Sequence, residues 1–185
     1  MRIVGGKNKG QRLAALKGAA TRPTSDRIRE ALFNILAHGI GLELEGCAVL
    51  DAFAGTGALG LEALSRGAAS ALFIDYSEAA LDQVRENAEA LNEDAVVAMR
   101  ADIRKLGPPP AGMAPAGLVF LDPPYGEALI GAALGVLAGP GWLADGAVLV
   151  AETGKSEDIE VPEKFVVIDE RGYGSTNIMF LRYSA

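Results

Sequence analysis

Cysteine and histidine are almost absent from this chain of 185 residues, which contains only Cys47 and His38. A single cysteine excludes an intrachain disulfide and a multi-cysteine metal site, and with one histidine a zinc enzyme is not expected. A Ser-His-Asp or Cys-His hydrolase would depend on His38. Because His38 ends a helical pattern just before Gly39, we expect it at a helix C-cap instead.

Long apolar runs are also missing, although half of the residues are hydrophobic. The longest uncharged stretch, 128–144, is interrupted by Gly139-Pro140-Gly141. It falls short of the roughly 20 apolar residues that a membrane span needs. The basic, glycine-rich start lacks the apolar core of a secretory signal, so we expect a cytoplasmic protein. At roughly 150 residues per domain, the length predicts one domain with a short appendage.

Positive charge is scarce after residue 30. Residues 1–30 hold eight Lys or Arg against two acids, whereas the rest of the chain holds nine basic and twenty-two acidic side chains. A basic segment on an acidic body is typical of local contact with a polyanion, although a solvated segment without a partner would share this pattern. Gly and Asn between the cations favour a loop that follows a nucleic-acid backbone. We expect such contacts from Arg2, Lys7, Lys9, Arg12, Arg22 and Arg27.

The N-terminal region predicts two elements. Residues 1–17 alternate weakly around a tip rich in Gly and Lys, which is typical of a β-hairpin. A helix should follow, capped by Thr24 or Ser25, with apolar residues at helical spacing on one face. We therefore expect a basic hairpin at residues 1–23 as an extension of a main domain at 24–185.

Short apolar runs and amphipathic segments alternate from residue 48 onward. This alternation predicts an α/β fold with a parallel sheet covered by helices on both faces. A C-terminal hairpin with a Gly-Tyr-Gly turn adds an antiparallel strand. We expect strands at 48–51, 71–75, 95–100, 118–121, 147–152, 165–169 and 178–182, and helices at 57–65, 77–91 and 127–138.

A glycine-rich loop follows the first of these strands. Its spacing, Gly55-x-Gly57-x-x-Gly60, satisfies the dinucleotide fingerprint, and Asp75 follows Gly55 by twenty residues as an NAD ribose acid would. The glycines alone therefore do not separate a nicotinamide enzyme from an S-adenosylmethionine enzyme, and a glycine turn without a ligand is a third alternative. Asp51, at the strand end, favours the methyl donor, because its carboxylate could bind a cationic amino group and would repel a pyrophosphate.

The tetrapeptide Asp122-Pro123-Pro124-Tyr125 follows the buried run 118–121. Ligands of open α/β sheets bind just beyond the carboxyl ends of the strands. The Asp122 carboxylate and a backbone carbonyl could accept N–H groups of an exocyclic amine, and Tyr125 could stack on the base. The prolines restrict φ and would hold this arrangement in place. An ordinary Pro-Pro turn with a surface acid is the alternative.

Four stretches together resemble the class I S-adenosylmethionine-dependent methyltransferases and, within them, the RsmD family of 16S rRNA guanine-N2 methyltransferases. They are residues 2–6, 21–34, 51–67 and 122–125. The likeness spans nearly the whole chain. Its specific part is the combination of the Arg- and Thr-containing residues 21–34 with the glycine loop in residues 51–67. The tetrapeptide alone also occurs in DNA adenine methyltransferases. The resemblance implies a Rossmann-like, mostly parallel seven-stranded sheet whose last strand is antiparallel.

The resemblance also implies the site and the partners. S-adenosylmethionine would have its methionine end at Asp51, Gly55 and Gly57 and its ribose at Asp75. The adenine would lie near Asp102 and Ile103. The full set expected to bind it is Thr24, Asp51, Phe53, Ala54, Gly55, Thr56, Gly57, Asp75, Tyr76, Asp102 and Ile103. The partner would be 16S rRNA in a small-subunit particle, bound by a monomer without a metal or a membrane.

The expected reaction is methyl transfer to the exocyclic N2 amine of a guanine in 16S rRNA, with residues 122–125 as the catalytic group. Cys47 precedes the first strand, which argues against C5-pyrimidine methylation through a cysteine nucleophile. An amino-methyltransferase acting on adenine or cytosine of another nucleic acid remains an alternative. Two further alternatives are a non-catalytic RNA-binding assembly factor and an NAD-dependent oxidoreductase.

Overall fold

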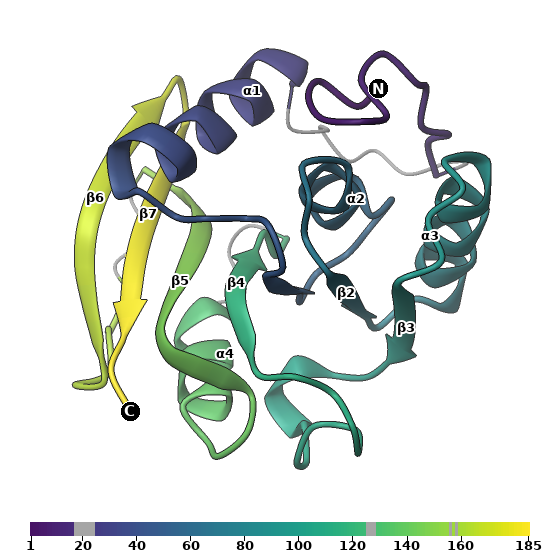
Figure 1. Cartoon of the computed structure of the whole chain (residues 1–185). Helices are drawn as coiled ribbons and strands as arrows, with labels where there is room; N and C mark the ends of the chain where they lie inside the picture. The colour runs from purple at the N-terminus through teal and green to yellow at the C-terminus, as the bar shows by residue number, and fades with distance from the viewer. Residues whose placement is uncertain (17–24, 125–128, 156, 158) are drawn as a thin grey trace.

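A computed structural model describes residues 1–16, 25–124, 129–155, 157 and 159–185. In these ranges the chain forms a seven-stranded sheet in the order β3-β2-β1-β4-β5-β7-β6 (Figure 1). The strands are β1 (Ala48–Asp51), β2 (Ser70–Asp75), β3 (Val96–Arg100), β4 (Ala116–Leu121), β5 (Leu143–Gly154), β6 (Phe165–Tyr173) and β7 (Thr176–Tyr183). The helices are α1 (Asp26–Asn34), α2 (Ala58–Ser65), α3 (Glu78–Ala90) and α4 (Leu129–Leu137), with a π-helical turn at Ile35–Ile40 and a 3₁₀ turn at Ile103–Lys105.

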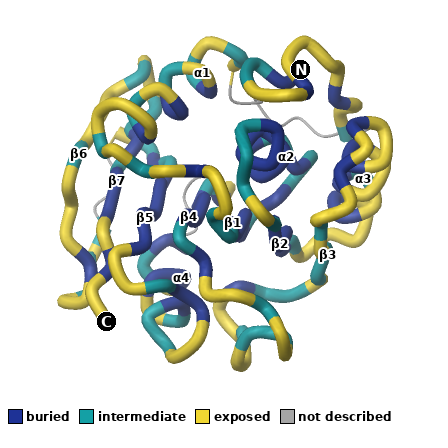
Figure 2. The backbone as a smooth tube through the Cα atoms, in the orientation of Figure 1, coloured by how far each residue is buried: buried dark blue, intermediate teal, exposed yellow. Residues whose placement is uncertain are grey.

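The first five strands are parallel, β7 is antiparallel to β5, and β6 is antiparallel to β7. This arrangement confirms the predicted mostly parallel sheet that ends in an antiparallel hairpin. The central strands are apolar because both of their faces are covered. In β1, Val49 packs with α1, α2 and α3, whereas its neighbour Leu50 packs with α4 on the other face. Figure 2 shows the buried residues in the middle of the sheet and the exposed ones on β6 at its edge.

The predicted helix starts are confirmed at two serines. Ser25 and Ser77 each accept a hydrogen bond from the backbone N–H three residues later, at 3.3 and 3.4 Å, and so cap α1 and α3. The expected C-cap role of His38 beside Gly39 is wrong. The helix continues as a π-helical turn through Ile40 and ends at Gly41, whose φ of 73° is the left-handed conformation that glycine adopts without strain.

The C-terminal hairpin is longer than expected, and its turn lies elsewhere. Tyr173, placed in the turn by its flanking glycines, is the last residue of β6, and the turn is formed by Gly174 and Ser175. The strands extend because β7 pairs along its length with β5 as well as with β6, from Gly154 opposite Thr176 onward. Local sequence does not reveal this second partner.

Residues 1–16 fold back on themselves and pack against the domain. Arg2 and Arg12 form an antiparallel bridge, and Ile3 N–H donates to the Gln11 carbonyl at 2.9 Å. Ile3 and Leu13 are buried in the same cluster as α1, α2 and α3. Figure 1 shows this segment lying over α2 and ending beside α3. The expected boundary at residue 23 falls outside the described residues and stays a prediction.

None of the helices in the described ranges is long and apolar enough to span a membrane.

Candidate cofactor and substrate site

Three aspartates meet at the carboxyl edge of the parallel sheet. The register places Asp51, the last residue of β1, opposite Phe73 of β2 and Phe120 of β4. Asp75 and Asp122 each lie two residues beyond these partners. The three acids therefore share the edge at which open α/β sheets bind ligands.

Asp51 is buried, with 2% of its surface exposed. Burial, with smaller contributions from the charges of Asp122 and Asp75, raises the pKa of its carboxyl to about 8, even though a hydrogen bond from Gly60 N–H lowers it. That bond, 3.0 Å to Oδ2, is the one hydrogen bond that the described residues give to this side chain. A positively charged ligand would favour the ionised form, as expected of an acid that binds a cationic group.

The glycine loop between β1 and α2 is shaped by close packing. Gly57 has a φ of 78°, and its N–H donates to the Ala54 carbonyl at 2.7 Å, which makes the turn into α2. A Cβ on Gly60 would overlap the ring of Phe73. Gly60 therefore lets α2 approach the sheet and brings its N–H to Asp51. Of the other loop residues expected to bind a cofactor, Ala54 is buried, and Phe53, Gly55 and Thr56 are half-buried.

Asp75 ties the glycine loop to the loop after β2. Its Oδ2 accepts the Gly55 N–H at 2.9 Å and its Oδ1 accepts the Ser77 N–H at 2.8 Å. Each carboxylate oxygen keeps a further lone pair for ligand hydroxyls. The next residue, Tyr76, is 73% exposed, and the Arg100 guanidinium lies over its ring at 5.9 Å. Asp75 is thus held in place by backbone donors, with an exposed aromatic ring beside it.

Asp102 and Ile103 follow β3 but have partners of their own. Arg104 donates to Asp102 through Nε at 2.9 Å and through Nη2 at 2.7 Å, and these bonds lower the pKa of Asp102 to about 2. Ile103 is 4% exposed and belongs to the apolar cluster that α4 covers. Asp102 is therefore held as an anion by Arg104, and the adenine role of the pair stays a prediction.

The residues predicted to hold the base follow the end of β4. Asp122 is half-buried, Pro123 is buried and Pro124 is exposed. The Phe120 carbonyl accepts the Ala52 N–H at 3.0 Å, which joins the end of β4 to the loop that follows β1. The predicted Tyr125, Thr24 and Arg22 lie outside the described residues.

The described residues fit an S-adenosylmethionine molecule. The fit rests on two carboxylates that accept N–H groups at the glycine loop, Asp51 from Gly60 and Asp75 from Gly55. Asp51 would be matched by the cationic amino group of this ligand, and Asp75 by its ribose hydroxyls. In their ionised form the same carboxylates would repel the pyrophosphate of a dinucleotide. Among the described residues, no group of three or more His, Cys, Asp or Glu could hold a metal ion.

The cations expected to bind nucleic acid divide into two groups. Arg2 and Lys7 already form ion pairs, Arg2 with Asp26 at 3.0 Å and Lys7 with Glu93 at 2.9 Å. Lys9, Arg12 and Arg27 are exposed, and in the described ranges they form no ion pair.

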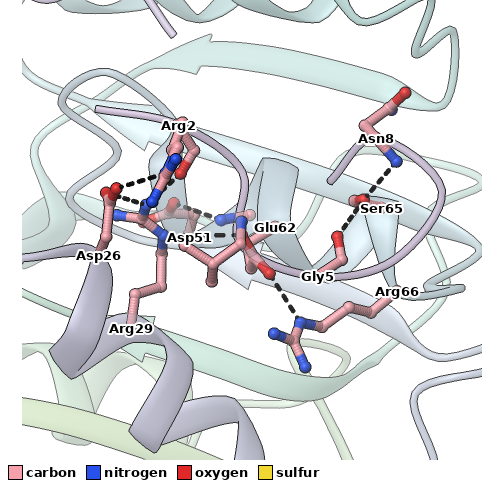
Figure 3. Close-up of polar contacts among 11 residues, drawn as sticks. Arg2, Gly5, Asn8, Asp26, Arg29, Asp51, Glu62, Ser65 and Arg66 are labelled. Carbon is pink, nitrogen blue, oxygen red and sulfur yellow. Dashed lines mark hydrogen bonds and ion pairs between the residues drawn. The ribbon is translucent and has the colours of Figure 1, made fainter. Parts of the chain in front are cut away.

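A buried ionic network joins α1, α2 and the N-terminal segment, residues 1–16 (Figure 3). Arg29 is one of the eight basic residues counted in residues 1–30, but its side chain is fully buried. Its guanidinium lies 3.0 Å from Asp26 and 3.6 Å from Glu62. Glu62 also accepts the Val4 N–H at 2.8 Å and the Arg66 Nε at 2.7 Å. This network anchors the start of the chain to α2, the helix that follows the glycine loop.

Four buried polar side chains, none of them predicted from the sequence, hold residues 1–16 in place. They are Glu62, Ser65, Asn87 and Glu93. Ser65 and Glu93 bind the tip, where Asn8 donates its backbone N–H to Ser65 at 2.9 Å and its amide to Glu93 at 2.7 Å. The sequence does contain an indication for Asn87. It lies three residues after Val84, on the apolar face of α3, where a polar side chain needs a hydrogen-bond partner.

Comparison with known proteins identifies the family. The model of the family Conserved hypothetical protein 95 matches residues 1–182. Ribosomal RNA small subunit methyltransferase D of Haemophilus influenzae is 34% identical, covering 94% of this chain and 89% of its own. The Escherichia coli protein of the same name is 37% identical, covering 83% and 74%.

A solved structure of the Escherichia coli protein yhhF superposes with a TM-score of 0.85 at 33% identity, covering 100% of this chain and 98% of its own. These matches confirm the class I methyltransferase fold and the resemblance inferred from the sequence. The chain therefore belongs to the Conserved hypothetical protein 95 family.

Proposed function

We propose that this protein transfers a methyl group from S-adenosylmethionine to the exocyclic N2 amine of a guanine in 16S rRNA during small-subunit assembly. One observation carries the proposal. Buried Asp51, beside the glycine turn, lies within electrostatic reach of Asp122, the acid that opens the base site. A cation site and an amine-accepting site are thus neighbours. The relatives named small subunit methyltransferase D supply the RNA class.

The cofactor is held, in this proposal, by the loops after β1, β2 and β3. Asp51, Gly55 and Gly57 bind the methionine end, and the remaining lone pairs of Asp75 accept the ribose hydroxyls. Thr24, Phe53, Ala54, Thr56, Tyr76, Asp102 and Ile103 complete the surroundings. When bound, S-adenosylmethionine supplies a methyl group that its sulfonium already makes electrophilic, so the protein needs to position the nucleophile rather than create a strong one.

The target base is held at the end of β4. The Asp122 carboxylate and the Pro123 carbonyl accept the two N–H groups of the amine, and Tyr125 stacks on the ring. The lone pair of guanine N2 is delocalised into the ring, and these hydrogen bonds favour the pyramidal, more nucleophilic nitrogen as positive charge develops. Asp122 then receives the proton that the amine releases.

The RNA must present this base unstacked, because the reacting nitrogen of a stacked base cannot reach the site. Of the cations predicted to bind nucleic acid, Lys9, Arg12 and Arg27 are exposed and form no ion pair within the described ranges, so they are available to its phosphates. Arg2 and Lys7 would have to exchange Asp26 and Glu93 for phosphate, so we expect them to contribute less.

The decisive test is transfer of a tritiated methyl group to small subunits that lack the modification, followed by mapping of the methylated nucleotide. Label on the N2 amine of one guanine in 16S rRNA is expected. Label on an adenine or cytosine amine would shift the assignment to another amino-methyltransferase. RNA binding without transfer would identify an assembly factor, and tight NAD binding in a fluorescence titration would favour an oxidoreductase.

A further inference from the structure

Asn87 of α3 bonds to two segments that lie far apart in the sequence. Its Oδ1 accepts the Ala14 N–H at 2.8 Å, and its Nδ2 donates to the Ala14 carbonyl at 3.2 Å and to the Thr56 carbonyl at 2.9 Å. Both amide hydrogens are therefore used. The orientation of the amide is fixed by these partners, since reversal would set its NH₂ group against an N–H and its oxygen against two carbonyls.

The two segments have different tasks in the proposed reaction. Thr56 lies between Gly55 and Gly57 in the glycine loop between β1 and α2, which is the cofactor loop of the proposed function. Ala14 is near the end of the N-terminal segment, residues 1–16, which presents the exposed cations Lys9 and Arg12. Asn87 is 2% exposed, so its amide depends on these partners for its hydrogen bonds.

The rest of the segment is anchored independently of the cofactor loop. Val4 binds Glu62, and Asn8 binds Ser65 and Glu93. Ile3 and Leu13 are buried in the core. Removal of the Asn87 hydrogen bonds should therefore release the end of the segment near Ala14 without detaching its first half.

We propose that Asn87 is a positioning residue that couples occupancy of the cofactor loop to the docking of residues 1–16, so that cofactor and RNA strengthen each other's binding. A ligand that orders the Gly55–Gly57 turn fixes the Thr56 carbonyl. The fixed carbonyl holds the Asn87 amide in the orientation that binds Ala14. By linkage, RNA held on the docked segment raises cofactor affinity by the same factor. The RNA half of this inference rests on the proposed substrate, whereas the effect of cofactor on docking rests only on the proposed cofactor site.

The first measurement needs no RNA. Exchange of the Ala14 amide hydrogen is followed by NMR with and without S-adenosylmethionine. In the wild-type protein, saturating cofactor should slow this exchange about fivefold, near the low end of common coupling strengths. In Asn87→Asp, the acceptor for Ala14 N–H remains but the donor to the Thr56 and Ala14 carbonyls is removed, so cofactor should leave the exchange unchanged. An exchange rate in the wild-type protein that does not respond to cofactor would overturn the proposal.

The second measurement is the dissociation constant of S-adenosylmethionine by calorimetry, with and without a 16S rRNA fragment. RNA should tighten binding about fivefold in the wild-type protein and in Glu89→Ala, a control at an exposed position of the same helix. In Asn87→Ala the ratio should fall to one. A weakened affinity with an unchanged ratio would show that Asn87 only supports the loop, and would refute the coupling.

A third variant separates the two sides of the link if Asn87 variants fold poorly. Ala14→Pro removes the N–H that Asn87 accepts and leaves the bond to Thr56 intact. It should keep the wild-type cofactor affinity without RNA and lose the RNA effect, whereas Ala15→Pro, at an exposed neighbour, should retain it. An RNA effect retained in Ala14→Pro would contradict the proposal. Failure of the wild-type protein to methylate small subunits would refute the proposed function instead, and the exchange measurement would still test the link.

Discussion

A hydrogen bond connects Gly60 and Asp51 across the glycine loop between β1 and α2: the Gly60 N–H donates to Oδ2 of Asp51 at 3.0 Å. This bond can form because Gly60 has no side chain that would overlap the Phe73 ring, which lets the first turn of α2 approach the end of β1. Helix packing and the charge state of the acid are therefore linked at one position.

Gly60→Ala should damage stability and cofactor binding together. The added methyl overlaps the Phe73 ring, so α2 must shift, at a cost of about 1–3 kcal/mol in the free energy of unfolding. Urea unfolding and calorimetry with S-adenosylmethionine measure the two effects. Gly135→Ala in α4 is the matched control, because a Cβ there meets nothing within 4 Å and no loss of stability is expected. A Gly60→Ala protein with normal stability and affinity would contradict this account of the loop.

Asp51 should make the protein less stable as pH rises toward 8. In the unfolded chain its carboxyl titrates near its ordinary pKa of about 3.9, whereas burial raises the folded pKa to about 8. Between these values the folded state binds more protons than the unfolded state, so the unfolding free energy falls with pH and levels off above 8. Asp51→Asn should lack this contribution. Urea unfolding of both proteins from pH 5 to 8.5 measures it, and parallel curves would refute the assignment.

Cofactor binding should release a proton from Asp51 near pH 7. The free site is largely protonated there, and the cationic amino group of S-adenosylmethionine favours the carboxylate. Calorimetry in two buffers with different ionisation enthalpies detects the proton. Asp122→Asn should reduce the release, because removal of the Asp122 charge lowers the pKa of Asp51. Equal heats in both buffers would show that Asp51 is ionised before binding.

Asp122→Ala should abolish methyl transfer while S-adenosylmethionine still binds. The variant lacks the acceptor for the target amine, and we expect a loss of about 10²–10³-fold or more in kcat, as for the removal of other transition-state hydrogen bonds. Single-turnover transfer and calorimetry separate chemistry from binding. Asp94→Asn, at an exposed position, is the control. Near-normal turnover of Asp122→Ala would remove this residue from the site.

RNA binding should depend on the exposed cations of the N-terminal segment. Lys9→Ala and Arg12→Ala should each lower the slope of log K against log salt by about 0.7–0.9 for each phosphate that the variant no longer neutralises. Point substitutions are required, because a deletion of the segment would expose the core around Ile3 and Leu13. Lys164→Ala, exposed just before β6, should leave the slope unchanged. Unchanged slopes in all three variants would place the RNA elsewhere.

The placement of the candidate site residues at one edge of the sheet was predictable from the sequence because its signals are local. Asp51 and Asp75 end apolar runs, and the spacing from Gly55 to Gly60 defines the turn between them. In a parallel sheet, strand ends meet at one edge, so the convergence of Asp51, Asp75 and Asp122 followed from topology alone. The family resemblance added the class of substrate.

The placement of the N-terminal segment was decided by the tertiary structure. Charge alone grouped Arg29 with Lys9 and Arg12, but Arg29 is buried against Glu62 and Asp26, whereas the other two are exposed. Asn87 gains its role from Ala14 and Thr56, which are 73 and 31 residues away. Spacing along the chain reports one turn or one strand end at a time. A buried polar group is defined by the partners that complete its hydrogen bonds, and those partners meet only when the whole sheet and its helices have assembled.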